Sequence, residues 1–152
     1  MFDGNFFAIL GAALAFFLAG AGSAKGVSIA GEAASGVVAE DSDKFVSVMI
    51  IEALPSTQGI YGFVIAFMIM AAMTEIGPGI TDSQGLTLLI AGLPIGIVGL
   101  FSGVYQGRVA AASIGIIAKR SSDMVKGIIL TLMVELFAIF AILISILMVG
   151  RV

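Results

Sequence analysis

A single acidic side chain lies inside an otherwise uncharged segment of the sequence. Glu135 stands in the run ILTLMVELFAIFAILISILM, and eight residues separate it from Lys126, the nearest charged residue on its N-terminal side. A lone carboxylate in such apolar surroundings costs several kcal/mol unless it is protonated, paired or bound to a cation. The position therefore predicts an ion-binding carboxyl group. The alternative is a structural carboxyl group that is hydrogen-bonded to a neighbouring helix.

A second set of polar groups surrounds a proline in the segment IEALPSTQGIYGF. On a helix, the i, i+3, i+4, i+7 spacing places four of them on one face: Leu54, Thr57, Gln58 and Tyr61. Pro55 has no N–H and its ring displaces nearby carbonyls, so we expect the carbonyl of Ile51 to lose its hydrogen-bond partner. Irregular backbone of this kind is tolerated at membrane depth where it is buried in protein or lines a polar cavity.

The elements that carry these residues are long apolar stretches. Of the 152 residues, 60% are hydrophobic and 11% charged, whereas about a quarter of a soluble domain is charged. Residues 4–24, 53–74 and 83–107 carry no charge, and 127–150 carry only Glu135. Each stretch reaches the ~20 residues that a membrane-spanning helix needs. We therefore expect an all-α membrane protein of four transmembrane helices, the first of them retained because the N-terminus lacks the basic region of a signal peptide.

The polar groups share one depth if the second and fourth helices begin near residues 46 and 124 and the third ends near 118. Glu135, Thr57, Gln58 and Gln106 then lie ~17–18 Å from the same membrane boundary, at ~1.5 Å per residue. Together with Tyr61 and the loosened carbonyl they offer only oxygen donors, which suit a hard cation. A proton does not need so many oxygens. We therefore expect bound Na⁺, with H⁺ as the alternative.

The two halves of the chain resemble each other at an offset of about 80 residues, which pairs Asp43 with Asp123. Three glycines of the first half have counterparts in the second: Gly11, Gly22 and Gly26 correspond to Gly92, Gly103 and Gly107. Each half holds two spans, so the copies cross the membrane in the same direction, unlike the inverted repeats of many transporters. We expect two tandem hairpins, residues 1–75 and 76–152.

Glycines also mark one face of the third span, where they recur every three or four residues: Gly92, Gly96, Gly99, Gly103 and Gly107. Small residues at this spacing let helix backbones approach closely. The stripe indicates either ordinary packing within one bundle or close packing of first and third helices in an inner ring of many protomers. The sequence leaves both open.

The distribution of basic residues predicts the orientation. Lys44 lies in the loop 38–45, and the loop 118–126 contains Lys119, Arg120 and Lys126, whereas the loop 74–85 has no Lys or Arg. By the positive-inside bias, the first and third loops are cytoplasmic, and both termini and the loop 74–85 lie outside. We expect a multi-pass protein of the plasma membrane.

Other charged residues fit less directly into this picture. Glu52 is interpreted as interfacial, about a turn and a half nearer the cytoplasm than the polar layer. Arg108 is expected to extend towards the interface or to pair with an acid on the cytoplasmic half. The chain contains no GxxxxGK[ST] motif, so no nucleotide-binding or catalytic site is expected. With a net charge of −3, it gives no reason to expect nucleic acid as a partner.

Three stretches, IIEALPSTQGIYGFVIAF, VYQGRVAAASIG and MVELFAIFAILI, resemble the proteolipid subunits of V-type ATPases, in particular those of bacterial sodium-translocating enzymes. The resemblance covers essentially the whole chain, and the LPxTQGxYGF pattern is specific. It implies a homo-oligomeric ring, embedded in membrane lipid, that turns against a stator while other subunits hydrolyse ATP.

The resemblance also implies a role for each polar residue. Glu135 would be the essential carboxylate, and Tyr61 would donate a hydrogen bond to it and hold the site closed. The Na⁺ shell would be completed by the side chains of Thr57, Gln58 and Gln106 and the backbone carbonyl of Leu54. The family's second carboxylate position falls at Pro55, so one ion site per four helices is implied. The implied partners are a stator membrane subunit that supplies an Arg and central-stalk subunits on the cytoplasmic loops.

Three rival interpretations remain. The first is a proton-carrying rotor of the same family, and the second is a small secondary transporter or channel. A transporter would purify as a monomer or small oligomer rather than as a large ring. The third is a purely structural four-helix membrane protein, in which the polar layer would have no purpose.

Overall fold

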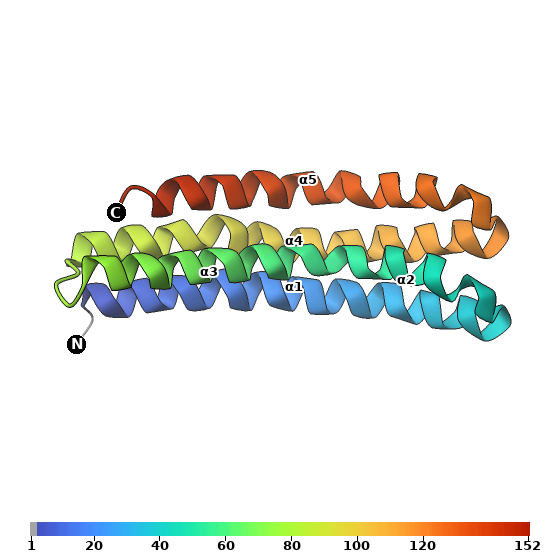
Figure 1. The fold of residues 1–152 in the computed structure, drawn as a ribbon, viewed down its shortest axis with the longest axis horizontal. Coiled ribbons are helices and arrows are strands. Elements are labelled where there is room, and N and C mark those ends of the chain that lie inside the picture. The colour runs from blue at the N-terminus through green and yellow to red at the C-terminus, as the bar shows by residue number, and fades with distance from the viewer. Residues whose placement is uncertain (1–2) are drawn as a thin grey trace.

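The computed structural model describes residues 3–152, and every regular element in that range is helical. The helices are α1 (Gly4–Glu40), α2 (Phe45–Ala53), α3 (Thr57–Ile76), α4 (Asp82–Lys119) and α5 (Met124–Val149) (Figure 1). Three short 3₁₀ turns occur at Ser42–Lys44, Leu54–Ser56 and Ser121–Asp123. The turn at Leu54–Ser56 joins α2 to α3, so these two helices form one span.

Within residues 3–152, four spans are long and apolar enough to cross a membrane: Gly4–Glu40, Ser42–Ile76, Asp82–Lys119 and Ser121–Val149. The longest has 38 residues, and at ~1.5 Å per residue it exceeds the ~30 Å hydrocarbon core. The helices therefore continue past the apolar stretches of the sequence. The predicted all-α fold of four spans, arranged as two helical hairpins, is confirmed.

Side chains and a glycine define the helix ends. Asp3 accepts a hydrogen bond of 2.9 Å from the backbone N–H of Phe6 and caps α1. Thr81 and Gln84 form a reciprocal capping box at the start of α4. Gly77 ends α3 with φ 78°, a conformation that favours glycine.

The two hairpin loops lie at the same end of the molecule, opposite the start of α1, the end of α5 and the loop between α3 and α4 (Figure 1). Lys44 of the first loop donates a hydrogen bond of 2.9 Å to the carbonyl of Ala118, near the second loop. Its ammonium also lies 3.4 Å from the Asp41 carboxylate. The hydrogen bond to Ala118 joins the two hairpins at that end, and the Asp41 contact holds the Lys44 side chain within its own loop.

The two long helices α1 and α4 pack directly against each other through glycine. A Cβ atom on Gly11 would lie 2.6 Å from the carbonyl oxygen of Leu88, so no larger residue fits. Gly92 packs against Gly11 itself, so glycines that the repeat paired by sequence face each other in space. The glycine stripe of α4 therefore packs against α1 of the same chain.

Helices α3 and α5 cover the paired α1 and α4, with α3 against both and α5 chiefly against α4. Two clusters of buried apolar residues form the core, one centred on Ile65, Leu88 and Ile95 and the other on Ile51, Ile114 and Ile117.

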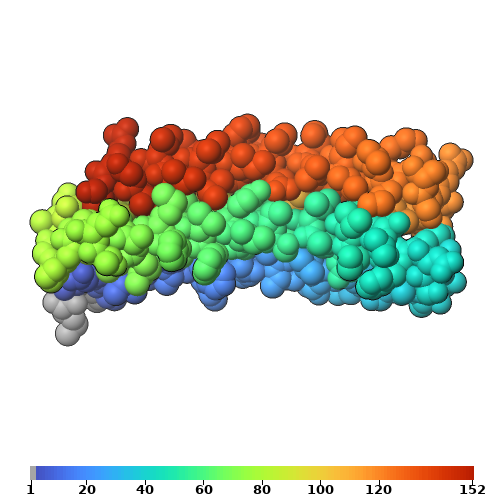
Figure 2. All heavy atoms as spheres, in the orientation of Figure 1, coloured from blue at the N-terminus to red at the C-terminus, as the bar shows by residue number. Residues whose placement is uncertain are grey.

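Figure 2 shows α2, α3 and α5 forming one broad face. Large apolar side chains of α3 and α5 are exposed, among them Phe63, Phe67, Phe137 and Phe140. Such a surface suits lipid as the surrounding solvent.

The glycine contact predicts a sharp difference between two positions of α1. A methyl group on Gly22 would lie 2.5 Å from the carbonyl oxygens of Gly99 and Leu100, whereas Gly36 has nothing within 4 Å. We expect Gly22→Ala to lower the free energy of unfolding by about 1–3 kcal/mol, because overpacking forces the helices apart. Gly36→Ala should leave it unchanged or slightly higher, because alanine favours helix. Thermal unfolding in detergent measures both, and equal stabilities would contradict the packing described.

A candidate ion-binding site

Glu135 lies on the inward face of α5 and is only 6% exposed. The Tyr61 hydroxyl donates a hydrogen bond of 2.6 Å to its Oε1. The Gln106 amide lies 3.4 Å from its Oε2 and donates to it. Helices α3 and α4 thus each supply a donor to a different oxygen of the same carboxylate. Charge-assisted hydrogen bonds of this kind are the stronger ones.

Two fully buried glutamines connect the second and third spans. The Gln58 amide donates to Oε1 of Gln106 at 2.5 Å. Gln106 also donates to the backbone carbonyl of Thr131 at 3.3 Å, one helical turn before Glu135. Both glutamines are 0% exposed, and buried amides need partners because an unsatisfied one costs free energy. The pair therefore holds α3, α4 and α5 in one register.

The 3₁₀ turn brings further oxygens into this set. The Thr57 hydroxyl lies 3.1 Å from the Leu54 carbonyl oxygen and 3.4 Å from Oε1 of Gln58. Close polar contacts thus run from the Leu54 carbonyl through Thr57, Gln58 and Gln106 to Glu135. The structure brings together all six predicted site residues: Leu54, Thr57, Gln58, Tyr61, Gln106 and Glu135.

The backbone around Pro55 differs from the sequence-based expectation. The carbonyl of Ile51 was expected to lose its partner, and this is wrong, because it accepts the N–H of Leu54. Tightening the helix to a 3₁₀ turn moves each bond to the residue three positions on. The N–H of Gly59 turns aside and donates to the Ser23 hydroxyl on α1 at 2.8 Å. At the interruption, the Ile51 carbonyl and the Gly59 N–H therefore both have hydrogen-bond partners.

Sequence reasoning missed three polar residues around the site. Thr131 is fully buried, and its hydroxyl lies 2.8 Å from the Gly127 carbonyl and 3.3 Å from the Ser113 hydroxyl. Its i, i+4 spacing from Glu135 places it on the same helix face, and this signal could have found it. Nothing in the sequence singles out Ser23 or Ser113.

The donor set indicates which ion could bind. Backbone, amide, hydroxyl and carboxylate oxygens suit hard cations rather than soft metals. One carboxylate cancels one positive charge, so a monovalent cation leaves the site neutral. A divalent ion would leave an uncompensated charge in an apolar region, which is costly.

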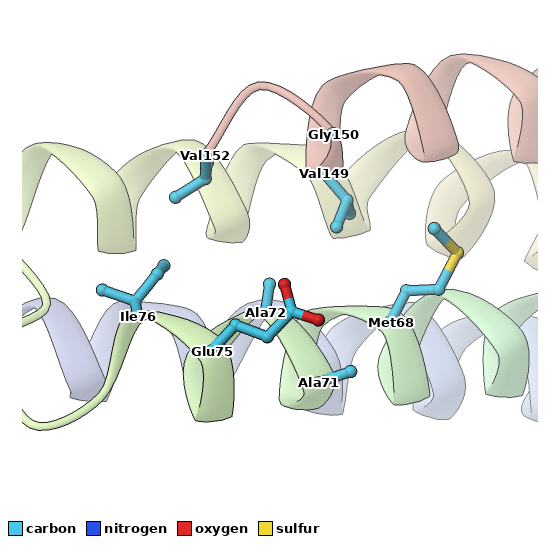
Figure 3. Close-up of a pocket in the computed structure, with 8 residues that line it drawn as sticks. All are labelled: Met68, Ala71, Ala72, Glu75, Ile76, Val149, Gly150 and Val152. Carbon is cyan, nitrogen blue, oxygen red and sulfur yellow. The ribbon is translucent and has the colours of Figure 1, made fainter.

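A hollow of 470 Å³ at the other end of α3 does not share these properties (Figure 3). Glu75 points into it from α3, and Val149, Gly150 and Val152 close its opposite side. Its other lining side chains are apolar: Met68, Ala71, Ala72 and Ile76. With one partly solvated carboxylate and no further oxygen side chain, it forms no ion shell.

Comparisons with known proteins agree with this arrangement. The sequence matches the family of ATP synthase C subunits twice, at residues 10–69 and 89–148. The K subunit of the V-type sodium ATPase of Enterococcus hirae is 48% identical over 96% of this chain and 92% of its own length. The K subunit of the A-type ATP synthase of Methanocaldococcus jannaschii is 37% identical over 97% of this chain and 64% of its own length. The 16 kDa proteolipid of the V-type proton ATPase of Nephrops norvegicus is 27% identical over 93% of this chain and 88% of its own length.

The Tyr61 contact predicts how readily Glu135 reacts. The hydrogen bond from the phenol holds the carboxylate in the site, and hydrogen bonds to charged groups contribute about 1.5–3 kcal/mol. We expect Tyr61→Phe to release Glu135 and raise its rate of modification by carbodiimide by about tenfold or more. Tyr105→Phe is the matched control, since Tyr105 lies on α4 and its side chain is exposed. Peptide mass spectrometry measures both rates, and no acceleration in Tyr61→Phe would show that the contact has no influence.

Proposed function

The chain belongs to the ATP synthase C-subunit family, and we propose that each copy carries one Na⁺ at the Glu135 site. As a member of this family it is an ion-translocating rotor subunit of a rotary ATPase and a non-catalytic part of the ATP-driven translocase. The identity of the ion and the residues that bind it are the proposed part.

The observation that carries the proposal is the connected set of oxygens around one buried carboxylate. The side chains of Thr57, Gln58, Gln106 and Glu135 and the carbonyl of Leu54 form the Na⁺ shell. Tyr61 donates to Glu135 and keeps it turned inward. A proton needs only the carboxylate, so this larger set favours Na⁺. The sodium ATPase subunit of Enterococcus hirae, 48% identical, supports the same ion.

The shell explains how an acidic residue can face lipid while the ring rotates. Na⁺ cancels the charge of Glu135, so the loaded site is neutral while it faces hydrocarbon. Release needs a group that attracts the carboxylate more strongly than Na⁺ does. A fixed Arg on a stator membrane subunit supplies it, since its guanidinium is always charged and binds carboxylates well.

We propose the wider assembly as well, with the orientation taken from the distribution of basic residues. Copies of the chain form a ring in the plasma membrane, and the hairpins 1–75 and 76–152 act together as one unit with one site. The loops 38–45 and 118–126 face the cytoplasm and bind the central-stalk subunits, and both termini and the loop 74–85 lie outside. The Lys44–Ala118 contact supports a shared docking end, because it ties the two loops to each other.

Carbodiimide modification of the purified ring, with and without Na⁺ at fixed pH, tests the ion. Bound Na⁺ keeps Glu135 ionised, so we expect Na⁺ to suppress labelling of Glu135, whereas K⁺ at equal ionic strength should not. The proton-carrying relative in Nephrops norvegicus represents the alternative, and labelling of Glu135 that ignores Na⁺ would favour it. Labelling of Glu52 in place of Glu135 would mean that the site lies elsewhere.

A further inference from the structure

We propose that Glu52 of one copy and Arg108 of the next form an ion pair across the junction between adjacent copies of this chain. The inference rests on the proposed ring. It adds which two surfaces of the chain meet there and which charges join them.

The first surface is the flank of α1 that faces away from α4. Gly22 packs on α4, because a Cβ atom added to it would lie 2.5 Å from the carbonyl oxygen of Gly99. Gly31 follows nine residues later, about 2.5 helical turns, and so points to the opposite side. A Cβ atom on Gly31 would lie 2.8 Å from Oε1 of Glu52. The Glu52 carboxylate therefore lies on this outer flank of the first hairpin.

The second surface is the flank of α4 that faces away from α1. Gly96 packs on α1, where an added Cβ atom would lie 2.9 Å from the Leu14 carbonyl oxygen. Tyr105 is nine residues further along, again about 2.5 turns, and points away from α1. The guanidinium carbon of Arg108 lies 5.5 Å from the centre of the Tyr105 ring. This stacking places the positive charge on the outer flank of the second hairpin.

The two charges lie at similar depth. The Gln58–Gln106 hydrogen bond places those residues at one level. Glu52 is six residues from Gln58, and Arg108 is two from Gln106, both towards the end that holds the hairpin loops. At ~1.5 Å per residue their backbones differ in level by ~6 Å, which a long arginine side chain spans. Copies related by cyclic symmetry about the membrane normal keep these levels.

Within residues 3–152, neither charge forms an ion pair with a residue of opposite charge. The ion pairs between residues 3–152 are Lys44–Asp41 and Lys126–Asp123. Glu52 borders a hollow of 360 Å³ whose other lining residues, apart from Ser35, are apolar: Ala34, Val38, Ala39, Phe45, Val48 and Met49. A carboxylate in such a place needs a compensating charge, and the opposite flank of an identical copy supplies one.

The repeat identifies a second copy as the partner of these flanks. The two family matches begin at residues 10 and 89, and this register aligns Gly22 and Gly26 with Phe101 and Tyr105. The glycines that the sequence comparison paired with them, Gly103 and Gly107, face them across the α1–α4 contact and so belong to a different surface. Inside the chain, the second hairpin covers Gly22 and Gly26. Phe101 and Tyr105 belong to the equivalent surface of the second hairpin, and they are exposed. The element that covers this surface in the same manner is the first hairpin of the next copy.

An unpartnered hydroxyl marks the same flank. Ser102 is 5% exposed, and its Oγ has no hydrogen-bond partner within residues 3–152. It lines a hollow of 290 Å³ between α4 and α5 together with Phe101, Tyr105 and Phe137. Its equivalent in the first repeat, Ser23, accepts the Gly59 N–H. A hollow with a free buried hydroxyl beside exposed aromatic rings suits coverage by another protein surface.

A charge exchange tests the pair in the assembled ring. Glu52→Arg and Arg108→Glu each place like charges together, and we expect each to speed dissociation of the ring in detergent by about tenfold or more. The double variant restores the pair, and its rate should return close to that of the parent. Glu32→Arg with Arg108→Glu is the matched control, because Glu32 neighbours Gly31 but is exposed on a different face. Additive effects at positions 52 and 108, or restoration by the position-32 exchange, would overturn the proposal.

Cross-linking provides a measurement that does not depend on ring stability. The chain contains no Cys, so Glu52→Cys with Arg108→Cys introduces the only two thiols. A short bis-maleimide should join copies into a ladder of covalent multimers up to the full ring. The pair Glu52→Cys with Leu86→Cys is the negative control, since Leu86 lies 22 residues, ~33 Å, from Arg108 along α4. A ladder in the control alone, or in neither, would contradict the junction.

Failure of this inference is distinguishable from failure of the proposed function. If rings form and Na⁺ protects Glu135 while positions 52 and 108 show no coupling, only the junction is wrong. If the parent chain forms no ring, both proposals fail.

Discussion

The cost of a carboxylate in hydrocarbon governs this structure. Lipid offers no hydrogen bonds, so each polar group at that depth must be satisfied by the protein or by its cargo. Glu135 is 6% exposed and receives donors from Tyr61 and Gln106, on two other helices. These bonds stabilise the negative charge of Glu135, but they do not neutralise it. A rotor that carries the site past lipid needs a monovalent cation to neutralise the charge. The geometry of the site and the proposed transport cycle therefore both serve to lower the cost of a carboxylate in hydrocarbon.

The glycine contact between α1 and α4 is what lets the second span reach the site. With the two long helices so close, α3 lies across both of them. A Cβ atom on Gly99 would lie 2.7 Å from the Cβ of Ala19 and 3.6 Å from the Cβ of Gln58. Glycine at this position therefore avoids a clash with Ala19 of α1, while Gln58 remains at ordinary contact distance from α4. The interruption at Pro55 completes the arrangement, because the 3₁₀ turn gathers a carbonyl, a hydroxyl and an amide oxygen within a few residues.

Duplication followed by divergence makes the chain asymmetric. The second hairpin supplies Glu135 and Gln106, and the first supplies Pro55 together with the Leu54 carbonyl, Thr57 and Gln58. The same asymmetry leaves an acid on one outer flank and a base on the other. Unlike flanks join head to tail, and a head-to-tail interface closes into a ring when the rotation between copies allows it. The Glu135 site and the proposed junction between copies thus both arise from the difference between the two hairpins.

The sequence by itself determined the four spans, the parallel hairpins and the membership of the polar layer. Hydropathy and helical rise are local properties, and a residue's depth follows from its distance along one helix. The tertiary structure decided which atoms meet. Ile51 kept its hydrogen bond because the whole turn tightened, which no single-residue rule for proline anticipates. Ser113 and Ser23 became part of the site region, and the glycine stripe came to lie against α1, only through the rotation of each helix about its axis. That rotation is set by side-chain packing between segments far apart in the chain, so it cannot be obtained from spacing within any one of them.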